Sequence, residues 1–301
     1  MLPAMPLLFL SRLVVEALAN DNLKDPNFST RTVYILWNIS RKRKKTPPIT
    51  LVQEINEFMS FATYSYCNAR VTLSDKHVYS IKHIWNSTTD AYAHVYREER
   101  RRAIIISFRG ADTYSKLLLA ASTVQIESFT DGAKVSSYSY SLMETLKEEV
   151  IETIHQNQHH QPMFKVVLVG HSLGGSIATL MAPFVADVSG KSLPSLRILT
   201  YNQPRVGNKA FAKHFNQLHF NFTRVVNKND PIPQYPTYRA GWSHVHQEVY
   251  IDKNDNYMLC STQSPEDPGC SLGKSSWLSF QPHHSYLGNT SIFNKYSSYC
   301  S

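Results

Sequence analysis

Residues 164–175 read FKVVLVGHSLGG. The first six are apolar apart from one lysine and rich in valine, which is typical of a central parallel strand that is covered on both faces. After Gly175, apolar residues recur at helical spacing as far as Pro183, where we expect the helix to bend or break. The stretch therefore predicts a strand, a sharp turn that carries Ser172, and a helix.

Ser172 stands at the centre of a Gly-x-Ser-x-Gly pattern, between glycines 170 and 174. Because glycines have no side chains, they let the strand and the helix approach closely while the serine takes a strained conformation with its hydroxyl exposed. The amide of Leu173 would then point to where an oxyanion forms. By itself the pattern also fits an ordinary strand-to-helix turn. We interpret Ser172 as a candidate nucleophile and look for its partners elsewhere in the chain.

Strands and helices alternate along most of the chain. Apolar periodicity predicts helices over residues 51–65 and 141–155, and strands over 78–84, 91–96, 103–108, 196–201, 223–227 and 249–251. Alternation of this kind implies an α/β fold in one domain, with a mainly parallel sheet and helices on both faces.

The first 45 residues differ from the remainder. Residues 1–19 are largely apolar and end in Ala-Leu-Ala, which resembles a signal-peptidase site, and no run reaches 18 uncharged apolar residues, so a membrane-spanning helix is not expected. A basic run, RKRKK at 41–45, precedes two prolines. It fits a processing site, although such a run also fits a solvated or nuclear-targeting stretch. We expect a signal peptide (1–19), a propeptide (20–45) and a mature domain (46–301).

The formal net charge of +8 is concentrated at the amino terminus. Residues 1–45 hold eight of the 31 basic and three of the 23 acidic residues, which leaves 23 basic and 20 acidic residues in the remainder. A mature domain with so balanced a charge does not indicate nucleic-acid binding.

Four cysteines, Cys67, Cys260, Cys270 and Cys300, allow three pairings. Their even number and the signal-like start favour an oxidising, secreted route. Five glycosylation sequons accompany them, at Asn27, Asn38, Asn86, Asn221 and Asn289. The spacing of cysteine and histidine does not suggest zinc, and we expect no metal or organic cofactor.

A second buried strand, over residues 103–108, ends in Arg-Gly-Ala. A serine that carries out acyl transfer needs two amide donors for the developing oxyanion, one of them commonly from a loop after an earlier strand. The amide of Ala111 is the candidate, although a plain strand end with a glycine turn explains the stretch equally well.

Next, Tyr114, Leu117 and Leu118 recur at helical spacing. They fit ordinary core packing, or a lid whose apolar face covers the cleft and turns toward lipid.

The serine also needs a base and a carboxylate, which follow in the order Ser, Asp/Glu, His in α/β-hydrolases. Asp230 lies just beyond a predicted strand in a proline-stiffened loop, where active-site groups of open α/β sheets collect. His283 and His284 both lie downstream. From their chemistry alone the sequence does not separate these two histidines.

With these pieces together, the chain resembles the fungal class 3 triacylglycerol lipases, the Rhizomucor-like branch of the α/β-hydrolases, over about residues 51–300. The resemblance rests on six ordered motifs: SYC (65–67), FRG (108–110), GHSLGG (170–175), YNQPRVGN (201–208), NKNDPIP (227–233) and HHSYLG (283–288).

The resemblance implies an α/β-hydrolase fold with a central, mostly parallel sheet, helices on both faces and a short helical lid over residues 112–123. It implies His283 as the base and Asp230 as the orienting acid. Oxyanion donors at Ala111 and Leu173, and disulfides Cys67–Cys300 and Cys260–Cys270, also follow from it.

This sequence departs from the family pattern in three places. Many members have Ser or Thr where Ala111 stands, a lid tryptophan is replaced by leucine, and a His-x-Gly-Phe segment reads SSYS at 136–139. We expect a secreted, monomeric ester hydrolase that acts on acylglycerols at a lipid–water interface. Its activity should fall below about pH 6 to 7, because the base must be neutral. Phospholipase A1, feruloyl esterase and a catalytically inactive binding protein are the alternatives.

Overall fold

The computed structural model describes residues 45–67, 75–113, 116, 124–188, 196–245, 247–261, 266–272, 274, 280–286 and 290–291. Residues Thr46–Ser301 form one compact unit. The expected signal peptide and all but the last residue of the expected propeptide lie outside the described residues, so this processing scheme stays a prediction. Within the described ranges, no helix is both long enough and apolar enough to cross a membrane.

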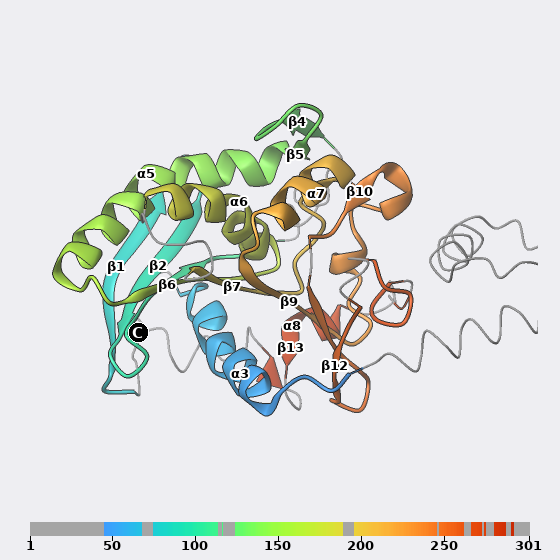
Figure 1. Cartoon of the computed structure of the whole chain (residues 1–301), viewed down its shortest axis with the longest axis horizontal. Helices are drawn as coiled ribbons and strands as arrows, with labels where there is room; N and C mark the ends of the chain where they lie inside the picture. Colours follow the sequence, from blue (N-terminus) through green and yellow to red (C-terminus); the bar gives the residue numbers. More distant parts are fainter. Residues whose placement is uncertain are drawn as a thin grey trace, which may run out of the picture. The chain divides into compact units, whose positions relative to one another are not determined.

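A central eight-stranded sheet forms the frame of the domain (Figure 1). Its inner five strands are parallel, and antiparallel strands complete both edges. Each strand that the apolar pattern predicts is present, and the α/β fold is confirmed. The spatial order is β1 (Val78–Asn86), β2 (Ala91–Glu98), β3 (Ala103–Phe108), β6 (Lys165–His171), β7 (Leu196–Tyr201), β9 (Asn221–Asn227), β11 (Glu248–Ile251) and β12 (Tyr257–Leu259).

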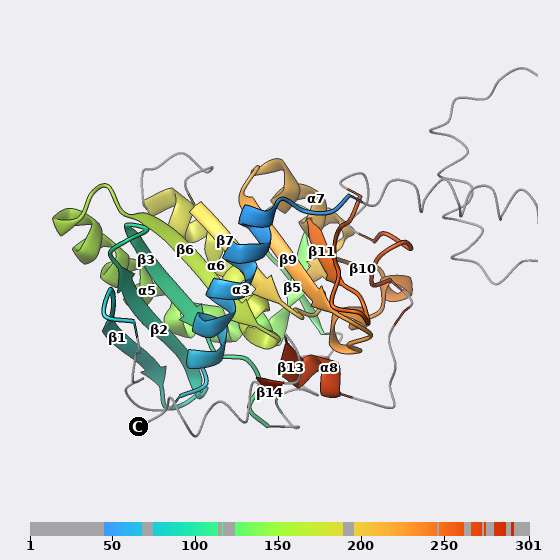
Figure 2. The same cartoon turned by 90° about the horizontal axis from the view of Figure 1, so that it is seen from below.

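Helices cover both faces of this sheet (Figures 1 and 2). In β3, Ile104 and Ile106 face one apolar core while Ala103 and Ile105 face the other, because successive side chains of a strand point to opposite faces. A buried strand between two cores is mostly apolar, and in β3 the one polar residue, Ser107, donates its hydroxyl to the Phe61 carbonyl. The first face carries α5 (Ser137–His160), α6 (Leu173–Val188) and α7 (Lys209–Gln217), and the second carries α3 (Ile49–Tyr64).

The expected break at Pro183 is wrong, since α6 continues through it to Val188. Proline removes one helical hydrogen bond. Met181 and Val185 on either side are fully buried in the same core, and this packing holds the helix together.

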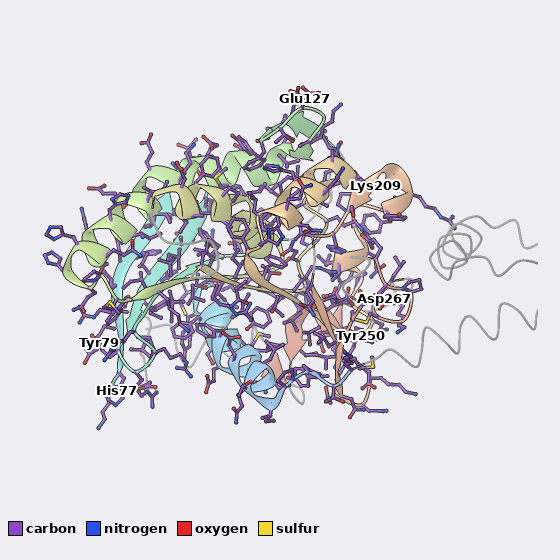
Figure 3. The ribbon with its side chains drawn as sticks, in the orientation of Figure 1. His77, Tyr79, Glu127, Lys209, Tyr250 and Asp267 are labelled. Carbon is purple, nitrogen blue, oxygen red and sulfur yellow. A yellow bond between two sulfur atoms is a disulfide. The ribbon has the colours of Figure 1, made fainter. Side chains whose placement is uncertain are left out.

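The structure also extends the sequence prediction in two places. Helix α5 begins at Ser137 instead of residue 141, because the Ser136 hydroxyl caps it by accepting from the Ser139 amide. A second, small sheet has the order β10 (Trp242–Ser243), β8 (Gly207–Asn208), β5 (Lys134–Ser136) and β4 (Gln125–Glu127). Charged side chains such as Glu127 and Lys209 point outward from this part of the molecule (Figure 3).

Candidate active site

Ser172 occupies the sharp turn between β6 and α6, with a left-handed φ of 56°. The two flanking glycines are required by space. A Cβ atom at Gly170 would lie 2.2 Å from the Gly174 carbonyl oxygen, and one at Gly174 would lie 2.1 Å from the Phe108 carbonyl oxygen. The turn therefore has the strained, closely packed form that the sequence predicts.

The expectation of an exposed serine hydroxyl is wrong for this structure, because Ser172 is only 1% exposed. The ring of His283 lies directly beside it, and His283 is itself 2% exposed. An ester can reach this serine only after some covering group moves.

Three buried side chains form a continuous line of hydrogen bonds at this turn. His283 Nε2 lies 2.9 Å from Ser172 Oγ, and His283 Nδ1 lies 2.7 Å from Asp230 Oδ2. The other carboxylate oxygen of Asp230 accepts from the amide of Ile232 at 2.8 Å. Asp230 follows the end of β9 and precedes the short 3-10 helix η2 (Ile232–Gln234). The structure thus brings together the serine, histidine and carboxylate that the sequence singled out.

The two adjacent histidines differ in their hydrogen bonds. Both hydrogen bonds of this line come from His283. His284 is half-buried beside it, and this burial lowers the pKa of His284 to about 4, with the neighbouring His283 contributing in the same direction.

His283 is carried by a four-residue helix, α8 (Gln281–His284), that has no side-chain cap at its start. The carbonyl groups at the end of a helix have no partner within the helix, and here side chains from the sheet supply donors. The Pro282 carbonyl accepts from Asn202 Nδ2 at 3.1 Å and from Asn227 Nδ2 at 2.8 Å. The His283 carbonyl accepts from His171 Nε2 at 2.9 Å.

These three donors stand at the carboxyl ends of neighbouring parallel strands: His171 ends β6, Asn227 ends β9, and Asn202 follows β7. From the sequence we expected no site function for any of them. A signal was nevertheless present, because polar residues at this edge of an open α/β sheet are typical of a functional site. The short helix α8 lies beside this edge (Figure 2).

The loop after β3 is held against the turn of Ser172. A Cβ atom added at Gly174 would lie 2.1 Å from the Phe108 carbonyl oxygen, so the end of β3 packs directly against the start of α6. The Arg109 guanidinium fixes the loop further, since it donates to the Asp90 carbonyl at 2.6 Å and lies 3.7 Å from the centre of the Tyr92 ring. Ala111, one of the expected oxyanion donors, follows in this loop.

The other expected donor, Leu173, is the first residue of α6. Its amide is one of those that have no partner within the helix, at the positive end of the helix dipole. The oxyanion function of Ala111 and Leu173 stays a prediction.

Several expected features fall wholly or partly outside the described residues. Tyr114, Leu117 and Leu118 of the expected lid are among them, as is Cys300. Cys67 is disulfide-bonded. Cys260 and Cys270 form the second expected disulfide. They lie close to Glu248, in the one grouping of metal-ligand types within the described ranges. Because both cysteines are oxidised, this grouping offers no thiolate to a metal.

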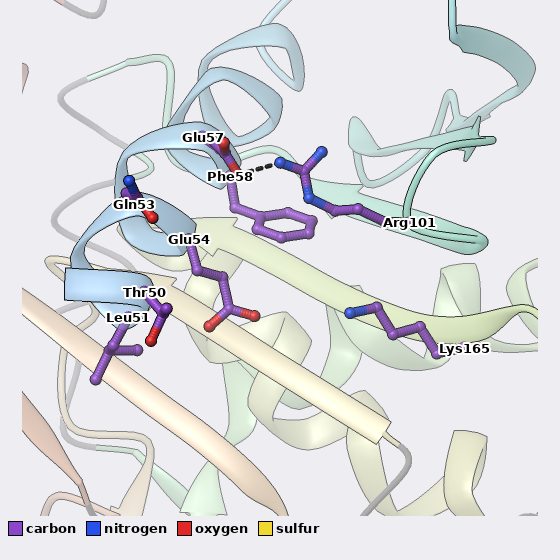
Figure 4. Close-up of a pocket in the computed structure, with 8 residues that line it drawn as sticks. All are labelled: Thr50, Leu51, Gln53, Glu54, Glu57, Phe58, Arg101 and Lys165. Atoms are coloured by element: carbon purple, nitrogen blue, oxygen red, sulfur yellow. Dashed lines mark hydrogen bonds and ion pairs between the residues drawn. The ribbon is translucent and has the colours of Figure 1, made fainter. Parts of the chain in front are cut away.

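A separate hollow of about 560 Å³ lies between α3 and the amino ends of β3 and β6, at the edge of the sheet opposite Ser172. Glu54 and Lys165 point into it (Figure 4). Both carboxylates that line it have cationic partners, since Glu57 pairs with Arg101 and Glu54 pairs with Arg197. This hollow contains none of the groups needed for ester chemistry.

Comparison with known proteins shows what this chain is similar to. The class 3 lipase profile matches residues 105–240. The secreted mono- and diacylglycerol lipase A of Penicillium cyclopium is 30% identical over 172 residues, which cover 57% of this chain and 55% of that protein. The chain thus spans little more than half the length of that relative. The lipase of Rhizomucor miehei is 29% identical over 257 residues, which cover 80% of this chain and 70% of the relative.

The fold agrees with these relatives. The solved structure of the native Rhizomucor miehei lipase propeptide complex has a TM-score of 0.72 and 26% identity, over 83% of this chain and 84% of that one. The matching profile, the relatives and the shared fold agree with the serine turn and the ordered motifs, and the chain is similar to the class 3 lipases.

Proposed function

We propose that this protein is a secreted lipase that hydrolyses the ester bonds of acylglycerols with Ser172, His283 and Asp230 as its catalytic triad. The observation that carries the proposal is the buried hydrogen-bond line from Asp230 Oδ2 through His283 to Ser172 Oγ, at 2.7 and 2.9 Å. The class 3 lipase relationship supports the reaction class. The names of the relatives, among them a secreted mono- and diacylglycerol lipase, support the substrate and the secretory route.

The hydrogen-bond line defines which proton moves. A carboxylate can only accept, so His283 Nδ1 carries the hydrogen that it donates to Asp230. In the neutral ring Nε2 is then an acceptor for the Ser172 hydroxyl. His283 Nε2 takes that proton as Ser172 Oγ attacks the ester carbonyl, and later gives it to the departing alcohol. Water attacks the resulting acyl-enzyme in the same way and releases the fatty acid.

The negative charge that develops on the ester oxygen needs donors already in place. The amides of Leu173 and Ala111 are our candidates, and loss of one such donor costs about 3 to 4 kcal/mol of transition-state stabilisation. The hydroxyl found in many relatives at the position of Ala111 is absent here, but the backbone amide remains. We therefore expect the oxyanion to be bound by backbone donors.

The proposed reaction also needs the site to open, since Ser172 and His283 are 1% and 2% exposed. A covered serine fits an enzyme whose substrate is a lipid surface, because an apolar cover can turn toward lipid. We expect activity to rise sharply when the substrate passes its solubility limit.

The test is hydrolysis by the full chain of p-nitrophenyl acetate, p-nitrophenyl palmitate and emulsified triacylglycerol, beside phosphatidylcholine and methyl ferulate. The proposal predicts a preference for long acyl chains and release of fatty acid from the emulsion, both lost in Ser172→Ala. Cleavage of phosphatidylcholine or methyl ferulate alone would replace the substrate. Inertness toward every ester, together with no labelling by a fluorophosphonate probe, would indicate a binding protein.

A further inference from the structure

His171 lies within the serine turn, and its ring lies beside that of His283, with 4.7 Å between the two ring centres. It is fully buried, at the end of β6, and its Nε2 lies 2.9 Å from the carbonyl oxygen of His283. A carbonyl oxygen can only accept, so Nε2 must carry a hydrogen. One ring nitrogen of His171 therefore holds the backbone of the proposed base.

The other ring nitrogen faces Tyr66, just beyond α3. The Tyr66 hydroxyl oxygen lies 2.7 Å from His171 Nδ1. Burial holds the pKa of His171 well below its usual range, and the neighbouring His283 adds to this effect, so the ring is neutral. With Nε2 protonated, Nδ1 carries no hydrogen and accepts from the Tyr66 hydroxyl.

The Tyr66 hydroxyl has a second neighbour, the loop after β3. It accepts a hydrogen bond from the amide of Gly110. The contact is close, because a Cβ atom at Gly110 would lie 2.1 Å from this hydroxyl oxygen and 2.6 Å from the His171 carbonyl oxygen. Only glycine fits here, and the loop lies directly on Tyr66 and the serine turn.

These bonds form one directed chain. The Gly110 amide donates to Tyr66, the Tyr66 hydroxyl donates to His171, and His171 donates to the His283 carbonyl. No member can reverse its direction, because the first group can only donate and the last can only accept.

We infer that Tyr66 and His171 are positioning residues that couple the oxyanion loop to the general base. Gly110 immediately precedes Ala111, so the orientation of the Gly110 amide bears on where the Ala111 amide points. His283 is carried by a helix of only four residues, so its placement depends on such outside bonds. Through Tyr66 and His171, a displacement of the loop after β3 shifts the helix that carries His283, and a displacement of that helix shifts the loop. The inference rests on the proposed function, since it assigns these residues to that same reaction.

A buried hydrogen-bonded pair that serves stability alone is the competing explanation. The two explanations differ in their consequences. A stabilising pair lowers the melting temperature and leaves the turnover of folded enzyme unchanged. A coupling pair lowers kcat while KM for a small ester changes little, and its two members act as a unit.

The experiment compares Tyr66→Phe, His171→Phe, His171→Gln and the double variant Tyr66→Phe/His171→Phe in the full chain. Tyr201→Phe is the matched control, because the Tyr201 side chain is equally buried and donates to the Ile55 carbonyl at 2.7 Å on the α3 side of the sheet. Readouts are kcat and KM on p-nitrophenyl butyrate, inhibition by a boronic acid that forms a tetrahedral adduct, and the melting temperature.

We expect each Phe variant at positions 66 and 171 to lose about 10- to 100-fold in kcat, with KM within about two-fold and with weakened boronate binding. The kcat of the double variant should be no more than about three-fold below the kcat of the less active single variant. His171→Gln, whose side-chain amide can still donate to the His283 carbonyl, should recover most of the loss. If His171→Phe does not fold, Tyr66→Phe and His171→Gln still carry the test.

Losses that multiply in the double variant would overturn the coupling, as would kcat values of folded enzyme that match those of Tyr201→Phe. Failure of the proposed function looks different. In that case the unmodified chain hydrolyses no ester and takes up no fluorophosphonate.

Discussion

Replacing Asp230 by asparagine tests the direction of the proposed proton transfer. The carboxylate accepts from two donors, the Ile232 amide at 2.8 Å and His283 Nδ1 at 2.7 Å, and Asp230 is 1% exposed. An asparagine offers one acceptor in place of two. If its oxygen keeps the Ile232 amide, its amino group faces His283 Nδ1, and the ring must place its hydrogen on Nε2. In that tautomer His283 cannot accept the proton of Ser172.

The opposite orientation of the asparagine is also unfavourable. Its amino group would then face the Ile232 amide, and each of these two buried donors without an acceptor costs about 1 to 3 kcal/mol. The side chain also no longer balances the charge of the imidazolium. We therefore expect Asp230→Asn to lower kcat about 10⁴-fold, the size of the effect for this change in a serine protease triad, or about 5.5 kcal/mol in the barrier.

The assay is turnover of p-nitrophenyl butyrate, beside the rate of fluorophosphonate labelling and the melting temperature. A folded Asp230→Asn variant that keeps more than a tenth of the original kcat would refute the reasoning. In that case the carboxylate would not set the tautomer of His283.

Two further predictions concern stability. The disulfide between Cys260 and Cys270 closes a loop with a sequence separation of 10. Replacing both cysteines by serine should lower the free energy of unfolding by about 3 kcal/mol while kcat stays within about two-fold, and an unchanged urea midpoint would contradict this. Burial also lowers the pKa of His94 to about 3 and holds the pKa values of His171 and His244 well below the usual range. Since the unfolded chain then binds more protons, the stability present above about pH 6.5 is lost as the pH falls, by about 1.4 kcal/mol per pH unit for each of these histidines. Urea midpoints at pH 7, 6 and 5 should show the decline, with a shallower slope in His244→Gln, and equal slopes would count against it.

Much of the fold was predictable because its signals are local. Strands that lie between two cores are apolar at most positions, as β3 and β6 are, and such runs stand out in the sequence. The serine turn was equally visible, since Gly170 and Gly174 are required by contacts between adjacent elements.

Features that depend on contacts between distant segments were not predictable. Helix α6 continues through Pro183 because Met181 and Val185 on either side are buried in the core. The local sequence pattern does not reveal this packing. The strands of the small second sheet have only two or three residues each, too few for a period to appear.

The same distinction between local signals and distant contacts applies to the residues of the candidate site. Asp230 was recognisable from its place after a strand. The residues that hold the base, Asn202, Asn227 and His171, act on carbonyl groups 55 to 112 positions away in the chain. A backbone acceptor carries no mark of its own in a sequence. The distinction between His283 and His284 likewise required either the family motif or the structure.

The central claim is that the buried line through His283 performs the ester chemistry. It is tested most directly by kcat on p-nitrophenyl butyrate for Ser172→Ala, His283→Ala and His284→Ala, each with its melting temperature. We expect the first two variants to fold and to lose at least about 10⁴-fold in kcat, while the kcat of His284→Ala stays within about three-fold of that of the unmodified chain. Full turnover in His283→Ala, or a loss in His284→Ala as large as that in Ser172→Ala, would contradict it.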